Sequence, residues 1–206
     1  MHALGFHQTI KKGKAYLLTK EGIKASKELD GAKSVPDDFL VKIVKPRTTI
    51  VIGQWLKNGA STSKIKIQEK ISNILGGYGR LLINIDAKKI SLPLEIATSE
   101  KLGYYGAVAI PMGEKVTFPS EKRNYPIWAM SLGKDYVKDY IMTAKAGGWY
   151  LEWHKDRPHF HMPLSKDARG FYILGRSLSN NTFELTAFRI PYGTAVYTKR
   201  GAIHCD

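Results

Sequence analysis

The chain has 206 residues, enough for one domain or one domain with a smaller appendage. It carries 32 lysines and arginines against 18 acidic residues, a net charge of +14 that attracts anionic partners. A single cysteine, Cys205, excludes an internal disulfide, and no run approaches the roughly 18 to 20 apolar residues of a membrane helix. With no signal-peptide pattern at the start, we expect a cytoplasmic protein without a membrane partner.

Residues 1–79 predict an N-terminal α/β extension. A weak helix is expected over residues 19–29, and β-rich runs cover residues 39–44 and 48–52. Apolar residues at helical intervals then predict a short helix that begins at Ser61 or Ser63 and ends before Gly76.

Residues 80–206 change character, because short β-rich runs alternate there with turn signals. The runs cover residues 81–85, 104–110, 125–130, 140–144, 148–153, 171–174, 183–190 and 194–198. Many short strands at regular spacing are typical of a sandwich or barrel, so the sequence predicts a mainly β domain.

Four of the six histidines lie between residues 154 and 204, and two of them form a His-x-His pair. On a strand His159 and His161 would share one face, because side chains alternate with period 2. The distant His204 could complete a metal site from a neighbouring strand. Glu152 and His154 also share a face, on the preceding strand. Each histidine taken alone has a simpler interpretation, as a hydrogen-bonded or surface imidazole.

The segment around His204 resembles the second motif of the cupin superfamily, G-x5-P-x-G-x2-H-x3-N. Gly193, Gly201 and His204 match it in spacing, while Lys199 stands in place of the proline. The motif's final asparagine would fall beyond Asp206.

The first cupin motif, G-x5-H-x-H-x3,4-E-x6-G, is matched in part by the histidine pair. His159 and His161 fit H-x-H, and Gly175 fits the closing glycine. Trp153 stands in place of the leading glycine, and the nearest acid to the glutamate position is Asp167.

This resemblance covers roughly residues 100–206 and implies a cupin-like jelly-roll barrel, here assigned to residues 80–206, on which the extension would pack. It implies His159, His161 and His204 as metal ligands, with Asp167 or water in a further position. The expected cofactor is a divalent transition metal (Fe, Zn, Ni or Mn), and imidazole also suits Cu.

A metal with open positions can act as a Lewis acid or lower the pKa of bound water. The candidates for a nearby acid or base are Glu152, His154 and Tyr197. Four cations could bind a substrate carboxylate or phosphate, although each is individually an ordinary surface charge. They are Arg157, Arg176, Arg189 and Lys199.

The leading hypothesis is a metal-dependent cupin isomerase, lyase or dioxygenase. Its partner would be a small polar or anionic molecule such as a carbohydrate or organic acid, and its assembly a homodimer. One alternative is a non-catalytic cupin that binds a ligand or a protein, because fold alone does not assign function. The other is a nucleic-acid-binding protein, suggested by the charge alone, since no zinc-finger spacing or RNP-like motif accompanies it.

Overall fold

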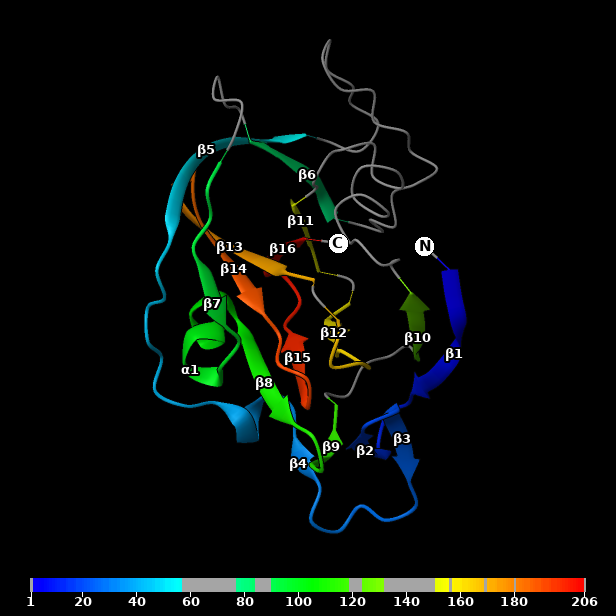
Figure 1. Ribbon diagram of the computed structural model, residues 1–206. Helices are drawn as coiled ribbons and strands as arrows, with labels where there is room; N and C mark the ends of the chain where they lie inside the picture. Colours follow the sequence, from blue (N-terminus) through cyan, green and yellow to red (C-terminus); the bar gives the residue numbers. More distant parts are fainter. Residues whose placement is uncertain are drawn as a thin grey trace.

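The computed structural model describes residues 2–56, 77–83, 90–118, 124–131, 151–155, 157–168, 170–179 and 181–205. These residues confirm a mainly β protein, since 16 strands accompany one α-helix, α1 (Ser99–Leu102), and the short 3₁₀ turns η1 (Asp37–Phe39) and η3 (Gly103–Tyr105) (Figure 1). Within the described residues, no helix is long and apolar enough to cross a membrane.

The largest sheet has seven strands in the order β13-β16-β11-β6-β5-β14-β7. Its members are β5 (Thr49–Leu56), β6 (Gly77–Ile83), β7 (Leu94–Ile96), β11 (Leu151–His154), β13 (Tyr172–Ser179), β14 (Thr182–Arg189) and β16 (Ile203–Cys205). Strands β13 and β14 also pair with each other as a hairpin, so five of the seven strands pair with two others, β14 pairs with three, and β7 pairs with β14 alone. The finer prediction of a cupin-like jelly-roll barrel stays a prediction.

Three smaller sheets complete the described structure. β1 (His2–Ile10) pairs with β10 (Tyr125–Ser131). A three-stranded sheet has the order β12-β15-β8, formed by β12 (His159–His161), β15 (Thr194–Thr198) and β8 (Ala107–Pro111). A four-stranded sheet has the order β3-β2-β9-β4, formed by β3 (Gly22–Ser26), β2 (Ala15–Thr19), β9 (Lys115–Thr117) and β4 (Lys33–Ser34).

The N-terminal part departs from two sequence predictions. The helix predicted over residues 19–29 is wrong, because this segment holds β3 of the β2–β3 hairpin, and Gly22 turns the chain with a φ of +115°. The strand predicted over residues 39–44 is also wrong. The 3₁₀ turn η1 ends at Phe39, and Leu40 and Ile43 are about half exposed in unpaired chain. The predicted helix near residues 61–75 and the run at 140–144 lie outside the described residues.

Strands from both predicted regions contribute to the same sheets. The predicted boundary between residues 79 and 80 falls inside β6, which pairs with β5 on one side and β11 on the other. Likewise β9 pairs with both β2 and β4, far before it in the sequence. Residues 1–79 therefore supply strands that are integral to sheets formed with the C-terminal part.

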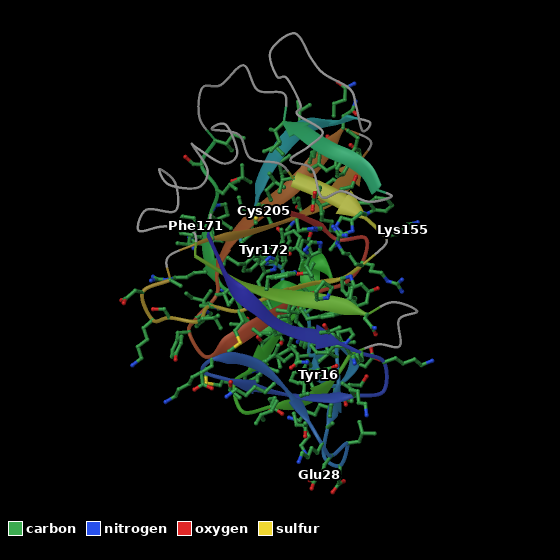
Figure 2. All side chains as sticks on the ribbon, turned by 90° about the vertical axis from the view of Figure 1, so that its right-hand side faces the viewer. Tyr16, Glu28, Lys155, Phe171, Tyr172 and Cys205 are labelled. Carbon is green, nitrogen blue, oxygen red and sulfur yellow. The ribbon has the colours of Figure 1, made fainter. Side chains whose placement is uncertain are left out.

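Two hydrophobic cores lie among the described residues. One lies against the seven-stranded sheet and includes Phe183, Leu185 and Ile203; the other lies between the β2–β9 sheet and β15, and includes Tyr16 and Ile110. Figure 2 shows this separation, with Tyr16 in the lower part of the molecule and Tyr172 and Cys205 above it.

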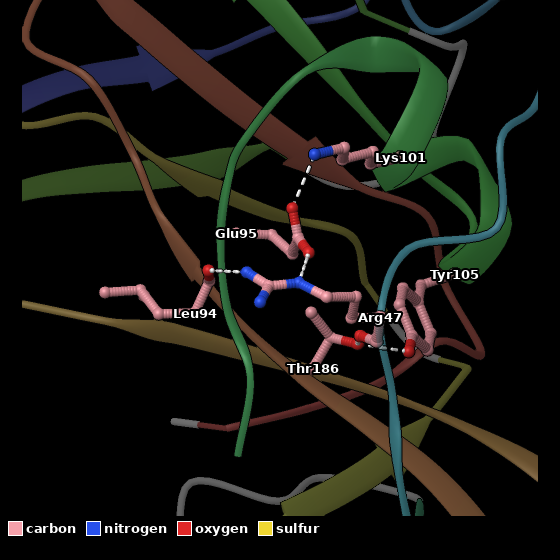
Figure 3. A network of polar contacts seen from close by, with 6 residues as sticks. All are labelled: Arg47, Leu94, Glu95, Lys101, Tyr105 and Thr186. Atoms are coloured by element: carbon pink, nitrogen blue, oxygen red, sulfur yellow. Dashed lines mark hydrogen bonds and ion pairs between the residues drawn. The ribbon is translucent and has the colours of Figure 1, made fainter.

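A polar network fastens the chain before β5 to β7 and α1 (Figure 3). The buried carboxylate of Glu95 accepts hydrogen bonds from Arg47 Nε at 2.6 Å and from the Lys101 ammonium. Thr186 Oγ1 donates to the Arg47 carbonyl at 2.6 Å and lies 2.7 Å from the hydroxyl of Tyr105. This network fixes one edge of the large sheet, where β7 runs parallel to the end of β14.

Candidate metal centre

Strands β11 and β16 bring an acid and two imidazoles to one face of the large sheet. Glu152 and His154 share a face because they are two residues apart on β11, and His204 of β16 lies directly opposite Glu152 in the antiparallel register. All three are almost completely buried, with exposed fractions of 1%, 1% and 2%. The turn before β16 is fixed to the same strand, because Gly201 N–H donates to the His154 carbonyl at 2.8 Å.

The third imidazole comes from another sheet. His159 begins β12, which is held by antiparallel pairing with β15. Its Nε2 lies 2.8 Å from Nε2 of His154, and its ring centroid lies 4.0 Å from that of His204. The centre therefore lies where the edge of the three-stranded sheet meets the face of the seven-stranded one.

Glu152 and His204 face each other with two acceptor atoms. His204 Nδ1 lies 2.9 Å from the Ala202 carbonyl, which can only accept, so Nδ1 carries a hydrogen. In the neutral imidazole this leaves a lone pair on Nε2, which lies 3.4 Å from Glu152 Oε1. Within the described part of the chain, neither of these two buried atoms has a hydrogen-bond partner. A cation between them would satisfy both.

The surroundings favour a charged carboxylate and a neutral imidazole. Burial alone would raise the pKa of Glu152, but the neighbouring imidazoles of His154 and His204 outweigh it and lower the pKa to about 2. Burial is the largest cause of a strongly lowered pKa at His159, followed by the charges of His204, His161 and His154. Metal ligation needs these same forms, an ionised carboxylate and a neutral imidazole.

Four potential ligand atoms, one each from Glu152, His154, His159 and His204, lie within 4.8 Å of one another. Ligand atoms around a tetrahedral zinc ion would lie about 3.3 to 3.6 Å apart, from the usual Zn–N and Zn–O lengths. The separations of Glu152 Oε1 from His204 Nε2 and His154 Nε2, 3.4 and 3.7 Å, are of that size. The shorter His154–His159 contact, 2.8 Å between the two Nε2 atoms, is a hydrogen bond that these histidines would give up to bind one ion together through Nε2. Three imidazoles and one carboxylate could hold a divalent transition metal.

The cluster overlaps with the predicted ligand set in His159 and His204 only. His161 is parallel to His159, with rings 5.9 Å apart and 5° between their planes, so the two do share a face. The ring of His161 packs instead on Tyr172, with centroids 4.4 Å apart, and lies outside the cluster. Asp167 is exposed in the loop after β12, where Ser165 Oγ accepts a hydrogen bond from its backbone N–H.

Glu152 and His154, predicted as an acid or base, belong to the cluster itself, whereas Tyr197 does not. Tyr197 pairs with Phe160 across β15 and β12, while the cluster residue His159 pairs with Thr198. Because side chains alternate along a strand, the phenol of Tyr197 points to the opposite face. It is buried in the second core near Phe118.

The four predicted substrate-binding cations are dispersed. Arg176 lies over the ring of Tyr104, with its guanidinium carbon 4.9 Å from the centroid. Arg189 is exposed at the end of β14, and Lys199 is half-buried in the turn before β16. Arg157 is half-buried, and its charge contributes to the lowered pKa of His159. Of the four, only Arg157 influences a cluster residue in this way.

The sequence signal that would have identified the observed cluster is Glu-x-His before His-x-His. Two potential ligands at even spacing on β11 face the same side as the imidazole opposite them, by the same alternation that relates His159 to His161. No protein-family model, curated protein or solved structure matches this chain. The chemistry of the cluster therefore carries the functional argument.

Proposed function

We propose that the protein binds one divalent transition metal through Glu152, His154, His159 and His204. The observation that carries this proposal is the convergence of two buried acceptors, Glu152 Oε1 and His204 Nε2, 3.4 Å apart. Burying a carboxylate and several imidazoles together is costly unless a cation or hydrogen bonds compensate the lost hydration. The backbone carbonyl of Ala202 supports the assignment, since metal-binding histidines commonly donate their other N–H to such an acceptor.

We further propose a metalloenzyme of the cupin type that acts on a small polar or anionic molecule. A bound divalent ion would supply Lewis-acid chemistry toward a substrate carbonyl or hydroxyl, as in an isomerase, lyase or oxygenase. His159 and His161 are half-buried, so this side of the cluster is the route by which a substrate would approach. The half-buried Arg157 lies on the same segment and could attract an anionic group to it.

The second candidate is a non-catalytic protein with a structural metal. Its support is the burial of Glu152, His154 and His204, because structural zinc sites are closed by four protein ligands. A catalytic ion needs a position open to substrate. Cobalt(II) distinguishes the two, since a closed tetrahedral site gives an intense visible spectrum that added anions leave unchanged. An open site gives a spectrum that shifts with small carboxylates.

The metal proposal is tested by the metal content of the purified protein and by rebinding after chelation. We expect one ion per chain in the wild type, and loss of binding by at least about tenfold in Glu152→Gln and His204→Ala, because even changes to groups that only orient metal ligands typically cost that much. Asp167→Asn is the matched control, because Asp167 is exposed and outside the cluster.

Two outcomes would overturn this assignment. One is a wild-type protein that holds no metal after gentle purification and rebinds none. The other is a protein in which Asp167→Asn removes the metal while Glu152→Gln keeps it. Circular dichroism of each variant would show whether a loss of binding reflects unfolding.

A further inference from the structure

Residues 40–45 have the composition of a strand but pair with no strand in the described structure. Leu40, Val41, Ile43 and Val44 are each 46 to 54% exposed. Valine and isoleucine are enriched in strands, where they pack on a pleated, half-buried surface. Figure 1 shows this stretch rising along the side of the molecule from η1, past α1, toward β5. It is an apolar edge that the described residues leave half uncovered.

The contacts of this stretch indicate an extended backbone. Leu40 has a φ of −73° and a ψ of 131°, in the β region. Ile43 packs on Gly103, because a Cβ added to that glycine would lie 3.1 Å from Ile43 Cγ1. The Lys45 ammonium lies 5.6 Å from the centroid of the Tyr104 ring. Residues two apart therefore contact successive residues of η3, as side chains on one face of a strand do.

One side of this backbone has unused hydrogen-bonding groups. The Val44 N–H donates to the Glu100 carbonyl of α1 at 2.9 Å, so this side of the chain faces α1. Backbone groups alternate in direction along an extended chain, so those of Val41, Ile43 and Lys45 point the other way. None of these three N–H groups donates to a backbone carbonyl of the described residues. Three exposed donors at strand spacing form an edge on which another strand can pair.

The edge ends at a proline. Pro46 is buried and has no N–H to donate, so a ladder of hydrogen bonds would stop after Lys45. The chain beyond it is already fastened, because Arg47 binds Glu95 through its side chain and Thr186 through its carbonyl. The available edge is therefore the single segment 40–45, about the usual length of a strand.

Charge favours an acidic partner over a second copy of this chain. Residues 40–47 contain three cations and no acid, and the acids at 37–38 precede the edge. Lys45 and Arg47 pair with buried carboxylates, whereas Lys42 is exposed and makes no ion pair with a described residue. Lysine on an edge strand disfavours pairing with an identical strand. The net charge of +14 likewise attracts an acidic segment and repels a second copy.

We propose that residues 40–45 bind an extended acidic segment of another protein as an added β-strand. Backbone hydrogen bonds to Val41, Ile43 and Lys45 would supply affinity, and alternating aliphatic and acidic side chains of the partner would supply specificity. The edge contains no residue of the metal cluster. The proposal does not depend on the metal centre, and its failure would leave the metal assignment unaffected.

The test uses the full chain with a short capped peptide of alternating glutamate and valine. Fluorescence anisotropy of the labelled peptide should show saturable binding. A peptide with lysine in place of each glutamate should bind at least about tenfold more weakly, because like charges then meet. Methylating every backbone amide of the glutamate peptide removes its donors and keeps its side chains, and should weaken binding as strongly.

Hydrogen exchange then shows where the peptide pairs. The N–H groups of Val41, Ile43 and Lys45 should exchange rapidly in the free protein and slowly with the peptide bound. The Val44 N–H, which is bonded to Glu100 already, is the internal reference and should change less. Protection at alternate residues is the signature of an added strand, and adsorption of the peptide by charge alone would not produce it.

Variants separate the backbone pairing from the charge. Val41→Pro removes one donor, and Leu40 already has the conformation that a following proline requires. It should weaken binding at least about tenfold, while Val41→Thr, of similar shape, should bind like the wild type. Lys42→Glu should weaken binding about threefold or more. Lys27→Glu makes the same charge change at an exposed position outside the edge, and should have little effect.

Three results would overturn the proposal: no saturable binding of the glutamate peptide, equal binding of its methylated form, or no added protection at Val41, Ile43 and Lys45. A dimer that Val41→Pro dissociates would assign the edge to a second copy instead. Binding to phosphatidylserine vesicles without binding to the peptide would assign it to a lipid surface, and would equally overturn the proposal. Circular dichroism identifies a misfolded variant, and the methylated peptide tests the pairing with the wild type alone.

Discussion

The two faces of strands β11 and β16 both bury side chains, but those side chains differ in polarity. One face carries Glu152, His154 and His204, and the other carries Leu151 and Ile203, which pack into the first core. The apolar face gains stability simply by leaving water. The polar face loses hydration that must be replaced, because buried charges and polar atoms are costly without partners. If the proposed metal binds here, the polar face depends on it for stability and the apolar face does not.

A substitution on the apolar face should destabilise the protein without changing the metal centre. Leu185 is 1% exposed on the core side of β14, and Leu185→Ala should lower the free energy of unfolding by about 2 to 5 kcal/mol, from lost burial and a residual cavity. Denaturant unfolding measures the loss, and metal content should stay at one ion per chain.

The control for this change is Ile52→Ala, because Ile52 is 64% exposed on neighbouring β5. Its effect should stay within about 0.5 kcal/mol. Equal effects at Leu185 and Ile52 would contradict the burial of Leu185 in this core.

The polar face should depend on the ion. Chelation of the wild type should lower its melting temperature, because a ligand present at about a hundred times its Kd stabilises the folded state by roughly 2.7 kcal/mol. Calorimetry with and without chelator gives the difference, and His204→Ala should show little response. A wild-type melting temperature indifferent to chelator would show that the cluster is stable without a cation.

A smaller effect on stability is expected at the edge of the seven-stranded sheet, where contacts within the protein keep Glu95 ionised. Hydrogen bonds from Lys101 and then Arg47 lower the pKa of Glu95 to about 2 from an ordinary value of 4.5. A lowered folded-state pKa stabilises the protein above the ordinary value, and that contribution is lost as the pH falls from about 4.5 toward 2.

Glu95→Gln should therefore be less stable than the wild type at neutral pH and lose less stability on acidification over this range. The difference should be modest and shrink with salt, because Arg47 is 74% exposed. Parallel pH dependences of the two proteins would contradict the role of this network.

Much of the fold could be predicted, because β-rich runs were long enough to identify strands locally. The runs at 171–174, 183–190 and 194–198 correspond to β13, β14 and β15. Residues 19–29 could not be predicted in the same way. Their weak helical pattern is overridden by pairing of β3 with β2, and β2 in turn pairs with β9, about 100 residues later, which local propensity does not contain.

The alternation of side chains along a strand predicted part of the candidate site. It correctly placed His159 with His161 and Glu152 with His154 on shared faces. Alternation does not specify which strands become neighbours or the register between them. The pairing of Glu152 with His204 comes from that register, and a shift by one residue would remove it.

The most direct test of the metal centre is a crystal structure with anomalous data at the absorption edge of the bound metal. We expect a single anomalous peak within coordination distance of Glu152 Oε1, His154 Nε2, His159 and His204 Nε2. A peak bound by His161 and Asp167 instead, or no peak after metal is supplied, would contradict the assignment.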